Sequence, residues 1–168
     1  AKITTTDGGL TWNIDTLTFP GALFDISFAN NTTGWVAGID GYVAKTINGG
    51  TAWTPQNSGL GVGQDLFSVF FSDASNGWAV GVGGIIINTN NGGTTPWTPQ
   101  ISNTVEDLNS VFFLNALKGW AVGFGGVIVS TTDGGTIWTD AIIDPGIDFF
   151  DVVFLDDTTG WVVGSVLA

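Results

Sequence analysis

The chain has 168 residues, of which 43% are hydrophobic and 11% are charged, and its formal net charge is −12. It contains no Cys and no His, so disulfides and metal sites built from thiolate or imidazole ligands are excluded. With no Arg and only Lys2, Lys45 and Lys118 as cations, nucleic-acid binding is not expected, because it needs clustered positive charge. Apolar runs end well before the length that a membrane helix needs, so membrane insertion is not expected either.

Residues 1–16 are predicted to form two short strands around the tetrad TDGG, which carries the Asp-Gly pair typical of hairpins. Residues 17–58 continue with an alternating apolar run, LFDISF, and a second strand, GWVAG. A two-residue hairpin at Asp40-Gly41, a third strand, YVAKT, and a further turn then lead to a fourth strand. Residues 59–101 and 102–142 repeat this order of four strands, whereas residues 143–168 contain only the first two.

These units form a repeat of about 42 residues. The turn tetrad recurs as TDGG, INGG, NNGG and TDGG, at spacings of 41, 43 and 42 residues. One tryptophan of each unit follows a glycine, and a phenylalanine precedes it by seven residues. The four pairs are Phe28 and Trp35, Phe71 and Trp78, Phe113 and Trp120, and Phe154 and Trp161. The other four tryptophans follow the GG turns, so all eight are repeat positions.

Four antiparallel strands per repeat is the size of one blade of a β-propeller, a sheet that must stack on its neighbours to bury both apolar faces. A Greek-key sandwich, the alternative fold, would not show a register locked to four-strand units. We therefore predict a single all-β domain over residues 1–168. It is a β-propeller built from four antiparallel blades, of which three are complete and the fourth is split between the N-terminal and C-terminal residues.

The turn motif resembles the Asp box, S/T-x-D-x-G-x-T-W, of bacterial neuraminidase-type (BNR-like) repeats. The match is complete in TTDGGLTW (5–12) and looser in the other three turns. With its GW strands, the whole chain is similar to the repeat of the photosystem II stability/assembly-factor propellers. The resemblance implies that the box residues are structural, with the acidic side chain accepting hydrogen bonds from its own turn. These residues are Asp7, Gly9, Trp12, Asn48, Gly50, Trp53, Asn91, Gly93, Trp97, Asp133, Gly135 and Trp138.

The same resemblance implies arginine-dependent functions that this chain lacks the residues to perform. Sialidases of this fold hold the substrate carboxylate with an arginine cluster, whose bidentate geometry lysine does not replace. The assembly-factor propellers are expected to use a basic, arginine-bearing face for their partner. Because the chain has no arginine, sialidase activity is excluded and a photosystem role is not expected.

Two sets of polar residues are candidate sites. Asp25, Ser68, Ser110 and Asp151 occupy equivalent positions in the first strands, which border the channel of a propeller, so they are expected to form a polar ring that is hydrated or holds a cation. Carboxylates also gather toward the C-terminus, where solvated loop charge is the favoured interpretation. A Ca²⁺ site from Asp144, Asp148 and Asp151 and a glycosidase-type carboxylate pair are the alternatives. No other cofactor is expected.

We expect a non-enzymatic module that is extracellular or at the cell surface, with a periplasmic or lumenal location also open. The inter-blade loops vary most and share one rim, where exposed apolar residues favour a protein or glycan contact surface or pack over the blade ends. These residues are Leu17, Phe19, Leu60, Val62, Ile142 and Ile143.

Self-assembly is a second expected function, because the half-blades 1–16 and 143–168 complement each other. Closure within one chain, between two chains or along a fibre all remain open, as does an excerpt from a longer propeller. A neuraminidase-like, glycan-processing enzyme is the third alternative, and the absence of Arg and His argues against it.

Overall fold

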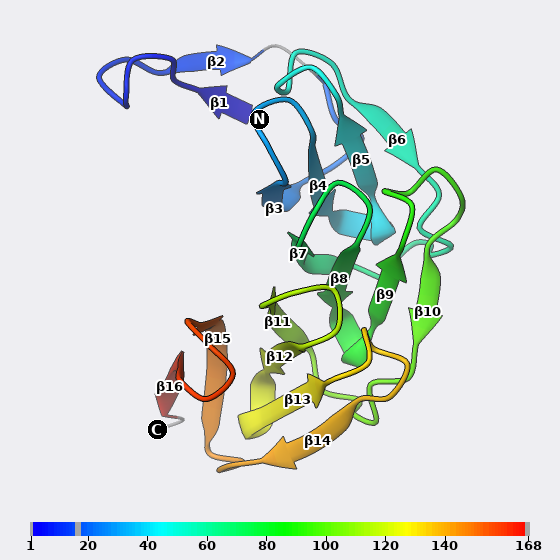
Figure 1. Ribbon diagram of the computed structural model, residues 1–168, viewed down its shortest axis with the longest axis vertical. Helices are drawn as coiled ribbons and strands as arrows, with labels where there is room; N and C mark the ends of the chain where they lie inside the picture. The colour runs from blue at the N-terminus through cyan, green and yellow to red at the C-terminus, as the bar shows by residue number, and fades with distance from the viewer. Residues whose placement is uncertain (1, 16–17, 167–168) are drawn as a thin grey trace.

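A computed structural model describes residues 2–15 and 18–166, and its strands form five separate antiparallel sheets (Figure 1). Three sheets have four strands in sequential order, and two sheets have two strands each. Across the described residues, no helix has the length and apolar character needed to cross a membrane. The four-stranded sheets are β3(Leu23–Phe28)–β4(Gly34–Gly38)–β5(Val43–Thr46)–β6(Thr54–Gln56), β7(Leu66–Phe71)–β8(Gly77–Gly81)–β9(Ile86–Thr89)–β10(Thr98–Gln100) and β11(Leu108–Phe113)–β12(Gly119–Gly123)–β13(Val127–Thr131)–β14(Thr139–Ile142). The two-stranded sheets are β1(Lys2–Thr4)–β2(Asn13–Asp15) and β15(Ile147–Phe154)–β16(Gly160–Val166).

The sheets follow one another around an arc that is open on one side (Figure 1). The first strand of each complete sheet lies on the inner side of the arc and the fourth lies on the outer side, as in the blades of a propeller. The two-stranded sheets stand at the two ends of the arc. The prediction of an all-β propeller with four-stranded antiparallel blades is confirmed, and the two halves of the blade predicted to be split form separate two-stranded sheets.

The connection between the second and third strand of each complete blade is a three-residue turn. These turns are η1 (Ile39–Gly41), η2 (Val82–Gly84) and η3 (Phe124–Gly126). Positive φ occurs at both central positions, for example 56° at Asp40 and 70° at Gly41, which is the conformation of the expected type I′ hairpin. Gly84 meets a second requirement, because a Cβ there would lie 2.2 Å from the carbonyl oxygen of Thr104. Glycine at this position therefore lets the turn pack against the following inter-blade loop.

Each phenylalanine of the repeat covers the glycine of its own GW pair. Phe71 lies directly opposite Gly77 in the β7–β8 ladder, and a Cβ on Gly77 would lie only 2.3 Å from the ring. The other face of the same ring stacks on Trp35 of the preceding blade, with ring centroids 3.4 Å apart and planes 7° from parallel. Glycine thus makes room for the ring within a blade, and the ring in turn joins two blades.

The same stack recurs at all three interfaces between successive sheets from β3 to β16. Trp78 stacks on Phe113 and Trp120 stacks on Phe154, each with centroids 3.5 Å apart. Trp35 and Trp78 are essentially buried. Each Trp–Phe pair therefore stabilises the fold through its buried area and, in addition, through an aromatic contact of roughly 0.5–1.5 kcal/mol. The core is therefore a series of inter-blade layers, and these layers fix the angle between neighbouring blades.

Candidate binding surface

The two rims of the arc carry different turns. On the loop rim, the inter-blade loops meet the η turns: the backbone N–H of Val82 donates to the carbonyl of Asp65 at 3.0 Å, and Phe124 donates to Asp107 at 3.0 Å. On the opposite rim, the Asp-box turns receive support from the hairpin turn of their own blade, as where Gly134 donates to the carbonyl of Leu117 at 2.8 Å. The variable inter-blade loops therefore share one rim.

The Asp boxes are closed networks of local hydrogen bonds. Asp7 accepts from the hydroxyl of Thr5 at 2.7 Å and from the backbone N–H of Thr11 at 3.0 Å. Hydrogen bonds from the side chain and then the backbone of Thr11, with that from Thr5, hold the pKa of Asp7 well below its ordinary value. Asn48 accepts in the same way from the N–H of Ala52 at 2.9 Å. The acceptor atom is thus committed to its turn whether the residue is Asp or Asn.

The tryptophans after the box turns differ in burial. Trp97 and Trp138 are 3% and 1% exposed, Trp53 is half-buried, and Trp12 is 57% exposed. Trp97 donates its indole N–H to the side-chain carbonyl of Gln56 at 3.3 Å, and the amide of Gln56 donates to the carbonyl of Gly92 at 3.0 Å. Gln100 makes the equivalent link to Trp138. Sequence reasoning missed these glutamines, although the recurring TPQ segment could have revealed them.

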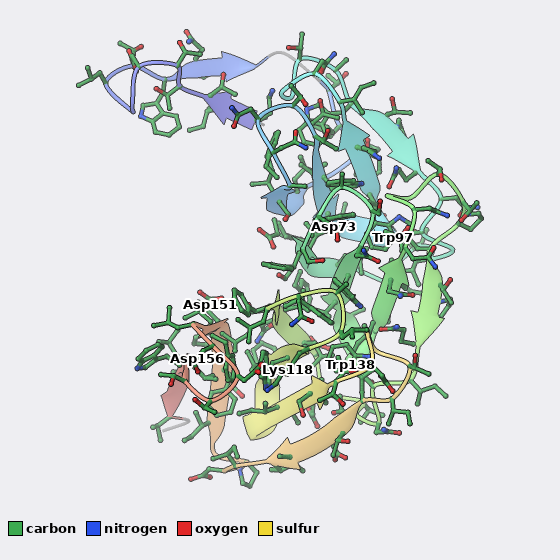
Figure 2. All side chains as sticks on the ribbon, in the orientation of Figure 1. Asp73, Trp97, Lys118, Trp138, Asp151 and Asp156 are labelled. Carbon is green, nitrogen blue, oxygen red and sulfur yellow. The ribbon has the colours of Figure 1, made fainter. Side chains whose placement is uncertain are left out.

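The structure brings the four predicted ring residues together as one row on the inner strands β3, β7, β11 and β15 (Figure 1). The hydroxyl of Ser68 donates to Asp25 at 2.9 Å, and that of Ser110 donates to Asp151 at 2.8 Å. Ser68 also accepts from the backbone N–H of Val111 at 3.4 Å. Asp151 lies at the inner side of the arc (Figure 2). The row links successive blades and borders an open hollow of about 430 Å³.

The three carboxylates considered for Ca²⁺ bind separate partners. Asp144 accepts from the N–H of Gly146 at 2.9 Å, Asp148 from that of Gly125 at 3.0 Å, and Asp151 from Ser110. Over residues 2–15 and 18–166, no group of three or more carboxylates is arranged to hold a metal ion.

A repeated inter-blade hydrogen bond was missed in the sequence. Asp65 accepts from the backbone N–H of Asp40 in η1 at 2.8 Å, and Asp107 accepts from Gly83 in η2 at 2.8 Å. Asp148 accepts from η3 in the same way. The spacings of 42 and 41 residues between these aspartates are a signal that could have been found. On the loop rim, part of the negative charge therefore fastens one blade to the next.

The exposed apolar residues expected on this rim divide into two groups. Phe19 packs edge-on against Tyr42 and Trp53, with ring centroids 6.3 Å apart in both pairs, and Leu60 packs against the core layer around Trp35. Val62, Ile142 and Ile143 are exposed, by 92%, 62% and 63%. Leu17 lies outside the described residues. The first group covers blade ends, and the second is available for contact.

A surface hollow of about 660 Å³ opens on the loop rim beside the third complete blade. The 103–106 loop, η3 and the β14–β15 connection form its walls. Glu106, Asp140 and Asp148 supply carboxylates, while Val105 and Ile142, which are 83% and 62% exposed, supply apolar surface. The hollow therefore combines negative charge with exposed aliphatic side chains.

The two solved structures below with TM-scores above 0.5 support the propeller fold. YCF48 from Cyanidioschyzon merolae is 16% identical with a TM-score of 0.54, and the match covers 98% of this chain and 71% of that one. A structure described as YCF48 bound to D1 peptide is 16% identical with a TM-score of 0.49, covering 98% and 83%. A GH74 enzyme from Niastella koreensis is 17% identical with a TM-score of 0.60, covering 84% of this chain but 26% of the enzyme.

Among curated proteins, no sequence matches this chain. The sequence profile of the family described as photosynthesis system II assembly factor YCF48 matches residues 8–97 and again residues 57–147, which together make up more than half of the chain. The overlapping matches span the repeated box turns and GW strands that build the blades. The chain therefore belongs to the photosynthesis system II assembly factor YCF48 family.

Proposed function

We propose that this protein is a non-catalytic, protein-binding module that takes a basic and apolar segment of its partner on the loop rim. The observation that carries the proposal is the hollow of about 660 Å³, where Glu106 and Asp140 stand beside exposed Val105 and Ile142. Exposed aliphatic surface supplies affinity, and the carboxylates select a partner of opposite charge. The net charge of −12 adds a long-range attraction for such a partner.

Family membership supports the partner class. One solved YCF48 is described as bound to a D1 peptide, which makes a peptide-like segment a reasonable ligand class for a relative. This chain differs from the expected pattern because it has no arginine. An arginine-bearing face would take a negatively charged partner. We therefore propose that this chain takes a positively charged partner.

The commitment of the carboxylates supports a non-catalytic role. Asp148 accepts from the η3 turn and Asp133 from its own Asp box, so these groups stabilise the fold. A glycosidase needs two carboxyl groups held on either side of a scissile bond. The likeness to the GH74 enzyme extends over only 26% of that enzyme and supports the fold alone.

The proposal also places the protein in a secreted, periplasmic or lumenal compartment. A chain with no cysteine and only three lysines supports this placement. Fractionation of the source cells followed by immunodetection tests it, and recovery in the cytoplasmic fraction alone would contradict it.

Fluorescence anisotropy with a labelled 12-residue peptide of alternating Lys and Leu tests the binding mode. The double variant Glu106→Gln/Asp140→Asn should weaken binding about tenfold at low salt, because rim charge and peptide charge attract across a short distance. The matched control is Asp7→Asn/Asp157→Asn, which changes the net charge equally without altering the hollow. A peptide with Glu in place of Lys should not bind.

Equal weakening by both double variants would show that only net charge attracts the peptide, and the rim site would be refuted. Absence of binding to the wild-type chain would refute the proposed partner chemistry.

A further inference from the structure

The outer strands of the three complete blades differ in how their free edges are protected. β6 and β10 both have the sequence Thr-Pro-Gln, whereas β14 has Thr-Asp-Ala at the same place. The strand registers align Asp140 with Pro55 and Pro99. A proline on an edge strand hinders pairing with another strand, because it has no N–H to donate. The third blade therefore lacks a protection that the other two have.

The backbone groups of Asp140 and Ile142 point away from the blade. The N–H of Ile143 donates to the carbonyl of Gly126 at 3.0 Å. Inward and outward groups alternate along an antiparallel strand, so the N–H and C=O groups of Asp140 and Ile142 face outward. The position of Pro99 agrees with this phase, since a proline fits where no N–H is needed by the ladder. Among the described residues, no backbone hydrogen bond reaches these outward groups.

The exposure of this edge belongs to the outer position in the blade. All four residues of β14 are exposed, and so are the first two residues of β6 and of β10. Figure 1 shows the three strands on the outer side of the arc. At its beginning β14 is covered, because the side-chain amide of Asn103 donates to the carbonyl of Trp138 at 2.7 Å. The open edge therefore follows Trp138 and runs along Asp140 and Ile142.

The open edge borders the hollow on the loop rim. Asp140 and Ile142 line that hollow, as do Val105 and Glu106 of the preceding inter-blade loop. Side chains of a strand alternate between the two faces of its sheet, so every second side chain of an added strand would face the hollow. A strand on this edge would therefore pair its backbone with β14 and place alternate side chains near Glu106 and Val105.

Charge determines which strand the edge favours. Glu106, Asp140 and Asp148 line the hollow, and the chain carries a net charge of −12. Pairing with β14 of a second copy would bring two acidic strands together, and like charges on paired strands are destabilising. A strand with cationic side chains meets opposite charge instead. The edge therefore favours a basic partner over self-pairing.

We propose that the basic and apolar partner segment binds as an extended strand added to the outer edge of β14. This inference rests on the proposed function for the chemistry of the partner, and it adds the way in which the partner is held. Main-chain hydrogen bonds to Asp140 and Ile142 provide affinity, and the hollow contacts alternate side chains. Pro55 and Pro99 confine the addition to the third blade.

Returning the missing proline to β14 tests the proposal. Asp140→Pro removes the outward N–H, whereas Asp140→Asn removes the same charge and keeps that N–H. The Thr-Pro pairs of β6 and β10 indicate that the blade accepts proline here, and urea unfolding checks that both variants fold. The labelled Lys/Leu peptide should bind Asp140→Pro about tenfold or more weakly than Asp140→Asn in fluorescence anisotropy, because a hydrogen bond to the added strand is lost. Equal affinity of the two variants would overturn strand addition and leave the rim site intact.

Amide hydrogen exchange of the wild-type chain, followed by NMR, provides the second test. A saturating amount of the same peptide should slow exchange at Asp140 and Ile142 about tenfold or more, because their outward N–H groups become hydrogen-bonded. The amide of Val62, in an exposed loop of another blade, is the control and should exchange at the same rate with and without peptide. A peptide that binds without slowing exchange at Asp140 and Ile142 would overturn strand addition alone. A wild-type chain that does not bind the peptide would overturn the proposed function together with this inference.

Discussion

Truncation of Phe113 tests whether the inter-blade stacks hold the fold together. Phe113 is 2% exposed, its ring stacks on Trp78 at 3.5 Å and meets Trp138 edge-on at 5.8 Å. Phe113→Ala should lower the free energy of unfolding by about 4 kcal/mol, from lost burial and the remaining cavity. The two aromatic contacts contribute about 0.5–1.5 kcal/mol each to such a loss.

The matched control is Phe24→Ala. Phe24 is 48% exposed and has one edge-on partner, Phe67, at 5.7 Å. Its truncation should cost about 1 kcal/mol, in proportion to the smaller area removed from water. Urea unfolding followed by tryptophan fluorescence measures the free energy of unfolding of both variants. An unchanged slope of this free energy against urea concentration is the check on two-state behaviour. If Phe113→Ala costs no more than Phe24→Ala, the stacks do not carry the stability assigned to them.

The Asp-box and hairpin turns give two further predictions. The hydrogen bond from the backbone N–H of Ile137 is the largest cause that holds the pKa of Asp133 below its ordinary value. The ionised carboxylate therefore stabilises the folded state above the unfolded-state pKa, and this stabilisation is lost as the pH falls through the lower folded-state pKa. Asp133→Asn should keep the turn, as Asn48 does, and should lessen the fall in melting temperature as the pH drops below 3.8, the ordinary pKa of this carboxyl group. Asp133→Ala should lower the melting temperature at every pH. Gly84→Ala should cost about 2 kcal/mol or more in urea unfolding, because φ is +75° and the added Cβ would meet Thr104; a cost below 0.5 kcal/mol would contradict that reasoning.

The repeat made most of the fold predictable. Each unit has the same turn glycines and the same Phe, Gly and Trp positions, and a pattern that recurs four times separates structural positions from incidental ones. The positive φ at Asp40-Gly41 follows from residue types that tolerate it. The row formed by Asp25, Ser68, Ser110 and Asp151 was likewise accessible, since equivalent positions on stacked sheets fall beside one another.

The contacts between blades were harder to foresee. The aspartates at 65, 107 and 148 accept hydrogen bonds from η turns more than 20 residues earlier in the chain, and Gln56 reaches a tryptophan 41 residues later. The 42- and 41-residue spacing of these aspartates and the recurring TPQ segment mark them as repeat positions, but their partners become evident only when two blades stack. Phe19 and Val62 illustrate the same limit: both are apolar loop residues, yet one packs against Tyr42 and the other is 92% exposed.

The sequence by itself determined the blade, because periodic glycines, β-branched residues and tryptophans specify strands, turns and the face that each side chain occupies. Only the tertiary structure decided the curvature of the arc and hence the separation of its ends. That curvature is the sum of the angles set by Trp35 on Phe71, Trp78 on Phe113 and Trp120 on Phe154. Such angles depend on how side chains pack across an interface. They therefore cannot be derived from the number of strands in the sequence.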